Sequence, residues 1–341
     1  MTLAYELDDI PTLASLLQRE AREPMASLPS DVSLPPRLLE RALFEPLKGV
    51  ALRPGKEFRG RLTDIAWELS GGRGRAPVEL AGCVEALHLG SLIVDDIEDN
   101  SPRRRGAPSL HQVAGVPLAL NAGNYLYFFP SVLLARLVLD RDVELSLKNA
   151  MDRAILHCHY GQALDLSVRV TELRRREIPN VVLSVTRLKT GSLMQLAAEI
   201  GALAARGDEE RVSRLAKLGR ELGIALQMLD DLTGITCVRR CHKGHEDLLE
   251  ARPSWVWAWL AESQDDIGYL RLRALEEQVV QRELHPEIVA EELRTHIADH
   301  GRRAVRARLR AALGELEQNF EEGRAVAALR DEIERLERYD G

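Results

Sequence analysis

The sequence predicts an all-α protein, and three observations carry that prediction. Aromatic residues make up only 4% of the chain, whereas the helix-favouring residues Leu, Ala, Arg and Glu are abundant. Apolar residues recur at three- and four-residue spacing, and no stretch shows convincing strand alternation. No segment rich in Pro and Gly divides the chain after residue 37. We therefore expect one all-helical bundle over residues 37–341, preceded by an N-terminal arm over residues 1–36.

The predicted elements follow in chain order. The arm combines short apolar patches with a run of Ser and Pro between residues 27 and 36. One long helix is expected from about Pro77 to Asp99, with the proline at its first position. Another begins near Asp208, whose side chain can cap it. Two core-facing stripes are predicted near the C-terminus: Leu309, Leu313, Leu316 and Phe320, then Val326, Leu329, Ile333 and Leu336.

Composition and charge argue against several classes of protein. The net charge of −7 gives no general reason to expect nucleic-acid binding. No apolar run is as long as a membrane span, and the acidic N-terminus is unlike a signal peptide. Four cysteines in 341 residues make no disulfide framework, so a cytoplasmic location is expected.

The most informative motif is Asp-Asp-Ile-Glu-Asp at residues 95–99, directly after a long apolar run. Asp95 and Asp99 lie one turn apart on one helix face, where like charges repel. Carboxylates at this spacing suit Mg²⁺, which keeps several waters and takes up substrate phosphate oxygens. The plainer alternative is a solvated acidic helix end.

A second acidic pair, Asp230-Asp231, also ends an apolar helical run. We expect the two helix ends to face one cavity, where three carboxylates from two helices could hold Mg²⁺ ions around a diphosphate. Asp pairs also occur as plain helix caps, so this motif alone is weak.

Basic residues supply the complementary half of such a site. Arginines at 103–105 follow the first acids, and arginine binds phosphate oxygens in a bidentate way. Lys56 and Arg59 share one face near a helix start, and Lys189 precedes Gly191 in an otherwise apolar helix. A glycine at that point indicates close approach of another segment. Taken singly, each base could be an ordinary exposed side chain.

Together these residues resemble the trans-isoprenyl diphosphate synthases, with the first motif most similar to that of geranylgeranyl diphosphate synthases. The resemblance covers roughly residues 40–260 and includes further motifs in order: Glu45-Pro46, Gly55-Lys56-x-x-Arg59, Asn121-Ala122-Gly123-Asn124, Gly161-Gln162-Ala163-Leu164-Asp165, Lys189-Thr190-Gly191 and Gln227-x-x-Asp230-Asp231. It implies an isoprenoid-synthase-type helical bundle around a central active-site cavity.

The resemblance also implies a role for each matching residue. Asp95 and Asp99 would bind two Mg²⁺ ions with Asp96 in support, and Asp230 would bind a third. The allylic diphosphate would be held by Arg104, Lys189 and Lys243, in a half of the cavity lined by Gln162, Thr190 and Gln227. Isopentenyl diphosphate would be held by Lys56, Arg59, His88 and Arg105. The helical spacing independently places His88, Ser91, Asp95 and Asp99 in one stripe.

The implied reaction is ionisation, condensation and elimination. The metal ions and cations draw charge onto the departing pyrophosphate, the allylic cation alkylates isopentenyl diphosphate, and a proton is then lost. Below Asp95 the small residues Gly90 and Ser91 would leave room for the prenyl tail, and Leu87 could form a deeper floor. We therefore expect a C20 or longer product.

Two departures and three alternatives remain open. The family pattern Asp-Asp-x-x-Asp ends here in Gly234, which predicts weaker binding of the third metal. Cys237, Cys241, His242 and His245 suggest zinc, but at poor spacing. The first alternative is a terpene cyclase, which would not need the cations assigned to isopentenyl diphosphate. The second is a non-catalytic regulatory subunit, which would be expected to lose metal ligands. The third and most remote is an unspecified helical scaffold protein. A homodimer is implied by the resemblance alone.

Overall fold

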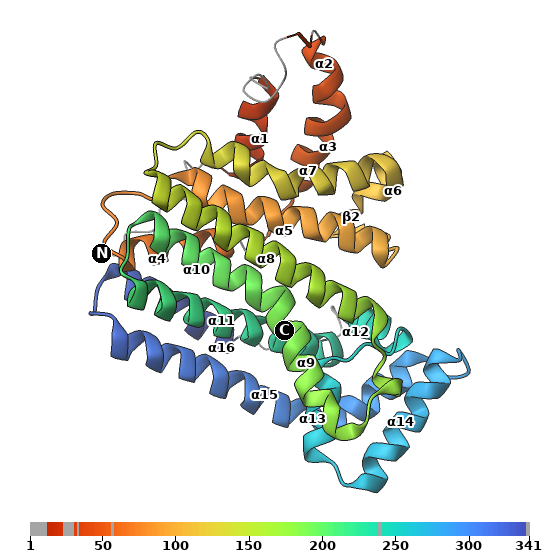
Figure 1. Ribbon diagram of the computed structural model, residues 1–341. Coiled ribbons are helices and arrows are strands. Elements are labelled where there is room, and N and C mark those ends of the chain that lie inside the picture. The colour runs from red at the N-terminus through yellow and green to blue at the C-terminus, as the bar shows by residue number, and fades with distance from the viewer. Residues whose placement is uncertain (1–11, 23–30, 33, 56–57, 238–240, 339–341) are drawn as a thin grey trace. The chain divides into compact units, whose positions relative to one another are not determined.

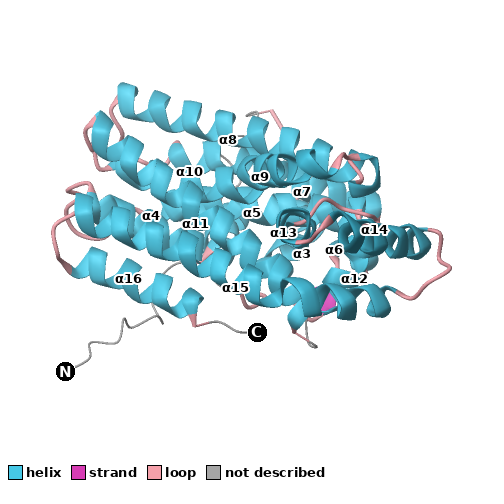
Figure 2. Cartoon of the chain, turned by 90° about the horizontal axis from the view of Figure 1, so that it is seen from below, coloured by secondary structure: helices cyan, strands magenta, loops and turns pink. Residues whose placement is uncertain are grey.

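The computed structural model describes residues 12–22, 31–32, 34–55, 58–237 and 241–338. Helices account for nearly all regular structure in these ranges (Figures 1 and 2), which confirms the predicted all-α class. No described helix is both long and apolar enough to cross a membrane. The chain forms two compact units, residues 1–149 with 200–207, and residues 150–199 with 208–341. The predicted division into an arm and one domain stays a prediction.

The first unit contains helices and one small hairpin. Its elements are α1 (Leu13–Arg22), α2 (Pro36–Leu39), the π-helix η3 (Glu40–Phe44), α3 (Glu45–Ala51), α4 (Phe58–Leu69), α5 (Val78–Glu98), β1 (Arg103–Arg104), β2 (Ala107–Pro108), α6 (Leu110–Ala114) and α7 (Val116–Leu134). Within the predicted arm, α1 buries Leu16 and Leu17 and contacts α3 and α5. The described part of the arm is therefore partly packed against the unit.

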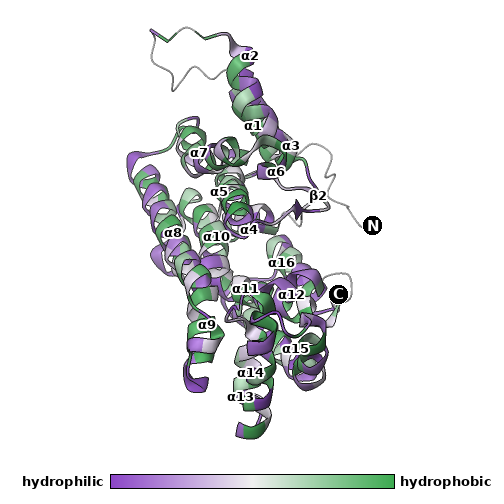
Figure 3. Ribbon diagram, turned by 90° about the vertical axis from the view of Figure 1, so that its right-hand side faces the viewer, coloured by the Kyte–Doolittle hydropathy of each residue, from purple (hydrophilic) through white to green (hydrophobic). Residues whose placement is uncertain are grey.

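The centre of the first unit is the pair α5 and α7. Apolar residues, green in Figure 3, dominate α7, and its residues Leu126 and Phe129 are fully buried. The two helices cross so closely that a Cβ added at Gly90 would lie 2.9 Å from the carbonyl oxygen of Gly123. Such a contact is possible only where both helices lack a side chain. The predicted helix from Pro77 to Asp99 is confirmed as α5, although Pro77 precedes its first residue.

The second unit consists of helices only among its described residues. They are the 3₁₀-helices η4 (Val170–Glu172) and η5 (Arg175–Glu177), α9 (Ile178–Thr186), the π-helix η6 (Arg187–Gly191), α11 (Glu209–Thr236), α12 (Cys241–Leu249), α13 (Trp255–Ser263), α14 (Asp266–Val280), α15 (Pro286–Asn319) and α16 (Arg324–Glu337). The boundary between the units falls inside α8 (Arg141–Ser167) and α10 (Ser192–Ala204).

Two local predictions in the second unit are confirmed. Asp208 caps α11 by accepting a hydrogen bond from the backbone N–H of Arg211 at 2.8 Å. The C-terminal stripes lie on α15 and α16, where most of their members are buried. Caps and stripes are properties of a few neighbouring residues, which is why sequence patterns find them.

The described part of the second unit contains a buried acid without a hydrogen-bond partner. Glu276 on α14 is 0% exposed, and neither oxygen of its carboxyl group meets a donor. Burial raises the pKa of Glu276 from 4.5 to about 8, and the neighbouring Arg273 opposes that rise. The folded protein therefore keeps a proton on this group that the unfolded chain has released.

The titration of Glu276 gives a pH-dependent stability. Because the folded-state pKa is the higher one, the free energy of unfolding is expected to fall as pH rises from 4.5 towards about 8. Glu276→Gln stays neutral, so its melting temperature should exceed that of the wild type at about pH 9 and approach it at about pH 4. Thermal unfolding followed by circular dichroism measures the melting temperatures of both proteins at each pH. An equal difference in melting temperature at the two pH values would contradict the titration of buried Glu276.

Candidate active site

The first acidic motif lies at the C-terminal end of α5. Arg104 joins two of its acids: its Nε donates to Asp96 Oδ1 at 2.7 Å, and its Nη2 lies 3.3 Å from Asp95 Oδ2. The Asp96 side chain is 5% exposed and that of Asp95 is 25% exposed. Burial raises the pKa of Asp96, while the hydrogen bond from Arg104 lowers it. Asp96 is thus held by the protein, and Asp95 is the more accessible acid.

A two-residue hairpin sets the position of the arginines. Strands β1 and β2 pair Arg104 with Ala107, and the turn consists of Arg105 (φ 52°) and Gly106 (φ 78°). Two consecutive positive φ values are typical of the turn that matches the twist of paired strands. This hairpin could not be predicted from the sequence, because strands of two residues show no alternation.

Arg105 is fixed by its contact with the segment before α4. Its Nη1 donates to the carbonyl oxygen of Arg53 at 3.2 Å, and Arg53 in turn donates to the carbonyl oxygen of Arg104 at 3.2 Å. A Cβ added at Gly55 would lie 2.9 Å from the Arg105 guanidinium. Glycine at 55 therefore lets the guanidinium lie directly against the backbone.

His88 lies in a strongly cationic environment. Burial, and then the positive charges of Arg59, Arg105 and Arg104, hold its pKa well below the ordinary value. The imidazole is therefore neutral at neutral pH and can donate or accept a hydrogen bond. Three of the residues assigned to isopentenyl diphosphate, His88, Arg59 and Arg105, thus lie together in the first unit, whereas Lys56 lies outside the described residues. The assignment itself stays a prediction.

The small residues before Asp95 have different surroundings. Gly90 lies where α5 crosses α7, and the close approach of the two helices leaves no room for a side chain at this position. Ser91 is half-buried and donates to the carbonyl oxygen of His88 at 2.8 Å, and Leu87 is buried. The predicted influence of these residues on product length stays a prediction.

In the second unit, Asp231 joins two helices. Its Oδ2 accepts the backbone N–H of Trp255 at the start of α13 at 2.9 Å, and its Oδ1 accepts from Gln227 Nε2 at 2.8 Å. Gln227 Oε1 accepts from Thr190 Oγ1 at 2.8 Å. Burial raises the pKa of Asp231 to about 6, although both hydrogen bonds favour the charged form. Both oxygens of Asp231 are thus used in positioning α13 and Gln227.

The residues Lys189 to Gly191 belong to the π-helix η6, a distortion common at functional sites. A Cβ added at Gly223 of α11 would lie 2.7 Å from the carbonyl oxygen of Thr190 and 2.9 Å from Gly191 Cα. The close approach predicted at Gly191 is confirmed, and its neighbour is α11.

A charged cluster beside η6 was only partly recognised in the sequence. Asp165 on α8 accepts a hydrogen bond from Lys189 Nζ at 2.6 Å and lies 3.3 Å from Arg252 Nη1. Gln162 lies one turn before Asp165 on α8, and Lys243 is exposed on α12. The motif containing Asp165 was noted without a role for this acid, since its partners are 24 and 87 residues away in sequence.

The acids fit Mg²⁺ better than zinc. No three His, Cys, Asp or Glu side chains converge on one point among the residues that the structure describes, which gives no support for the zinc interpretation. Magnesium needs only one or two protein carboxylates because water and phosphate oxygens complete its shell. Asp95 and Asp99 on one face of α5 would meet that need, as would Asp230 on α11.

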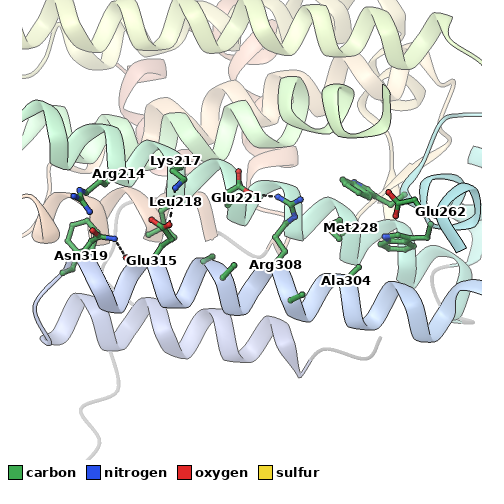
Figure 4. A pocket seen from close by; sticks show the side chains of 16 residues that line it. Arg214, Lys217, Leu218, Glu221, Met228, Glu262, Ala304, Arg308, Glu315 and Asn319 are labelled. Atoms are coloured by element: carbon green, nitrogen blue, oxygen red, sulfur yellow. Dashed lines mark hydrogen bonds and ion pairs between the residues drawn. The ribbon is translucent and has the colours of Figure 1, made fainter. Parts of the chain in front are cut away.

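Within the second unit, a cavity of about 560 Å³ lies between α11, α13 and α15 (Figure 4). Two ion pairs lie within its lining, Lys217 with Glu315 at 3.3 Å and Arg308 with Glu221. Neither Asp230 nor Asp231 lines this cavity, so it is not the site of the acidic motif.

Comparison with known proteins settles the family. The model of the polyprenyl synthetases matches residues 40–290. The chain belongs to the polyprenyl synthetase family. This confirms the resemblance inferred from the motifs and the expected enzyme class, that of the trans-isoprenyl diphosphate synthases.

Two curated relatives of this polyprenyl synthetase illustrate the similarity. The geranylgeranyl pyrophosphate synthase of Eremothecium gossypii is 33% identical over 220 residues, which cover 63% of this chain and 68% of the relative. The geranylgeranyl diphosphate synthase of Sulfolobus acidocaldarius is 31% identical over 185 residues, or 53% and 55% of the two chains. The alignments with curated relatives thus span between about half and two thirds of their length.

Solved structures share the fold over nearly the whole chain. A geranylgeranyl pyrophosphate synthase from Corynebacterium glutamicum, complexed with isoprenyl diphosphate and magnesium, has a TM-score of 0.77 at 20% identity and covers 97% of this chain and 99% of its own. A decaprenyl diphosphate synthase from Rhodobacter capsulatus has a TM-score of 0.76 at 22% identity, with 95% of each chain covered. At this identity the similarity shows the all-α fold.

The hydrogen bonds of Asp231 predict a specific loss of stability. Asp231→Ala leaves the Trp255 N–H and the Gln227 amide without an acceptor, which should lower the free energy of unfolding by about 1–3 kcal/mol. Urea unfolding without metal ions measures the change. Asp231→Asn keeps one accepting oxygen, so its free energy of unfolding should lie between those of the wild type and Asp231→Ala. Asp230→Ala should change the free energy of unfolding less than Asp231→Ala does. A stable Asp231→Ala protein would contradict the positioning role.

Proposed function

We propose that this polyprenyl synthetase condenses isopentenyl diphosphate with an allylic diphosphate to a C20 or longer prenyl diphosphate, with Mg²⁺ bound. The observation that carries the proposal is the arrangement at the end of α5. Asp95, whose side chain is 25% exposed, lies there about two helical turns after His88, and burial and three nearby arginines lower the pKa of that histidine. Carboxylates recruit metal, and guanidinium groups recruit diphosphate.

The protein groups divide the work between two diphosphates. Arg59, Arg105 and neutral His88 would bind and orient isopentenyl diphosphate, while Arg104 and Lys189 would grip the allylic diphosphate. Asp95, Asp99 and Asp230 would hold Mg²⁺, which supplies charge that stabilises the leaving pyrophosphate. We infer three ions with substrate bound. The apolar helix α5 would keep water away from the reacting carbon atoms.

The cationic surroundings of His88 favour condensation over cyclisation. A terpene cyclase ionises a single diphosphate and needs no second cationic site, yet Arg59 and Arg105 both act on His88. Asp95, Asp99 and Asp230 remain as candidate ligands, which argues against a regulatory subunit that has lost its metal site. The named relatives include geranylgeranyl, geranylfarnesyl and nonaprenyl diphosphate synthases, in keeping with a product of C20 or longer.

The reaction can be tested with the full chain, Mg²⁺, isopentenyl diphosphate and each allylic diphosphate in turn, followed by chromatography of the products. We expect a C20 or longer prenyl diphosphate. Asp95→Ala and Asp230→Ala should each lower kcat by about 10²–10³-fold, because each removes a ligand of a metal ion that would stabilise the leaving pyrophosphate. Asp331→Ala, an exposed acid on α16, is the matched control and should leave the rate unchanged.

Other outcomes would point elsewhere. Cyclic hydrocarbons or alcohols made without isopentenyl diphosphate would indicate a cyclase, and no turnover with any primer would indicate a regulatory subunit. A product that stops at farnesyl diphosphate would overturn the assigned chain length. Near-normal activity of Asp230→Ala would overturn the proposal that Asp230 binds a third metal ion.

We further propose that the protein forms a homodimer through α7. Val116, Leu120 and Phe128 are exposed apolar residues of α7, with exposed fractions of 47%, 40% and 73%. Exposed apolar residues of this kind are typical of a protein–protein interface.

The cytoplasmic location and the absence of a nucleic-acid partner stay predictions.

The dimer is tested by one charge on the α7 face. Phe128→Glu should convert a dimer to a monomer, since a charge would have to be buried in the contact. Size-exclusion chromatography with light scattering gives the mass. Leu270→Glu on α14, where the wild-type residue is 64% exposed, is the control and should keep the dimer. A wild-type monomer would contradict the proposal.

A further inference from the structure

Asp165, near the C-terminal end of α8, is the shared acceptor of two cationic side chains. Its Oδ2 accepts a hydrogen bond from Lys189 Nζ at 2.6 Å and another from Arg252 Nη1 at 3.3 Å. The side chains of Asp165 and Arg252 are each 15% exposed, and that of Lys189 is 28% exposed. Because water reaches these groups only in part, both ion pairs are screened less than pairs on the surface.

The stem of Lys189 lies against α8 one turn before this acid. A Cβ added at Gly161 would lie 2.8 Å from Lys189 Cγ, 2.9 Å from Leu188 Cβ and 3.0 Å from the backbone nitrogen of Lys189. No side chain fits at position 161 while η6 keeps this place, because these atoms belong to the η6 backbone or lie next to it. Gly161 and Asp165 share one face of α8. Gly161 thus leaves room for the lysine stem, and Asp165 binds the ammonium group at its end.

The segment that follows α12 is tied to α8 by a backbone contact. The N–H of Val170, just beyond the end of α8, donates to the carbonyl oxygen of Ala251 at 2.7 Å. Arg252 follows Ala251 directly in the chain, so this contact keeps its side chain near Asp165. Three segments that are distant in sequence, α8, η6 and the residues after α12, therefore meet at a single carboxylate.

The charges of this cluster suit a group that orients a lysine. Lys189 and Arg252 repel each other, and the carboxylate between them offsets that repulsion. A lysine ammonium group carries three N–H donors, so it can bind a carboxylate and a phosphate oxygen at the same time. The pair with Asp165 therefore fixes the direction of Lys189 without withdrawing it from an anionic ligand.

We propose that Asp165 is a positioning residue for the allylic half of the site: it fixes the ammonium group of Lys189, with Arg252 beside it, before a diphosphate binds. Gly161 shares this role because it makes room for the lysine stem. Asp165 acts through Lys189 rather than on the diphosphate, whose negative charge it would repel. The step from a positioned lysine to a bound allylic diphosphate rests on the proposed function.

The contact is tested without substrate. The amines of the full chain are labelled with a limiting amount of acetic anhydride, and each modified lysine is measured by mass spectrometry. Asp165→Asn keeps the size of the side chain but removes its charge, so labelling of Lys189 should rise by about fivefold. Lys148, which pairs with Glu144 on the same helix, is the internal reference and should be labelled equally in both proteins. Equal labelling of Lys189 in both proteins would overturn the positioning role.

A second variant leaves the carboxylate in place. Gly161→Ala adds one methyl group that displaces the lysine stem, so it should also raise labelling of Lys189, and it remains informative if Asp165→Asn fails to fold. Gly314→Ala is the matched control, because a Cβ added there on α15 meets nothing within 4 Å, and it should label like the wild type. Wild-type labelling of Lys189 in Gly161→Ala would contradict the role of Gly161.

Kinetics then test whether Asp165 acts on the allylic substrate through Lys189. Asp165→Asn should raise KM for the allylic diphosphate by about tenfold and leave KM for isopentenyl diphosphate unchanged, a selectivity that a general loss of structure would not give. Asp165→Glu restores the charge and should recover part of the loss. In the double variant with Lys189→Ala the two losses should not add, since both remove the same contact.

The outcomes separate this proposal from the proposed function. Additive losses in the double variant would show that Asp165 does not act through Lys189. Raised labelling of Lys189 in Asp165→Asn, together with a wild-type protein that makes no product, would uphold the contact and overturn the proposed function instead.

Discussion

Backbone-to-backbone contact between helices is the constraint on which the candidate site depends. Three glycine crossings bring a second segment against a helix that carries acids: Gly90 with Gly123, Gly191 with Gly223, and Gly234 with Gly244. At each crossing one glycine, Gly90, Gly223 or Gly244, has no room for a Cβ while the two segments keep their separation. Glycines, which have no functional side chain, therefore determine where the charged residues of these helices lie.

The two acidic pairs show a common division. In each pair one acid is tied to the protein, Asp96 by Arg104 and Asp231 by the Trp255 N–H and Gln227. The neighbouring acid, Asp95 or Asp230, is then the candidate ligand. Fixing one carboxylate orients the helix end and limits the freedom of the other, which reduces the entropy lost when a metal ion binds. We therefore interpret each doubled aspartate as one support and one candidate ligand.

Sequence patterns predicted the features that depend on a few neighbouring residues. The helix before Asp95 and the cap at Asp208 follow from periodicity and local hydrogen bonding. The reason for Gly90 could not be found in this way, because its neighbour Gly123 lies on another helix. The partners of Asp165 and the contact of Gly234 with Gly244 are likewise long-range. The hairpin at residues 103–108 was missed because it is too short to have a period.

That hairpin has a consequence for how the chain can change in evolution. The pairing of Arg104 with Ala107 and the two-residue turn fix which guanidinium meets the acids of α5 and which meets the segment before α4. A single inserted or deleted residue between Arg104 and Ala107 would change the length of the turn and shift the register of the pairing. A substitution there would affect a single side chain, whereas a change of length would disrupt the contacts of both Arg104 and Arg105 at once. Spacing, more than residue identity, should be the property that relatives of this chain keep in this segment.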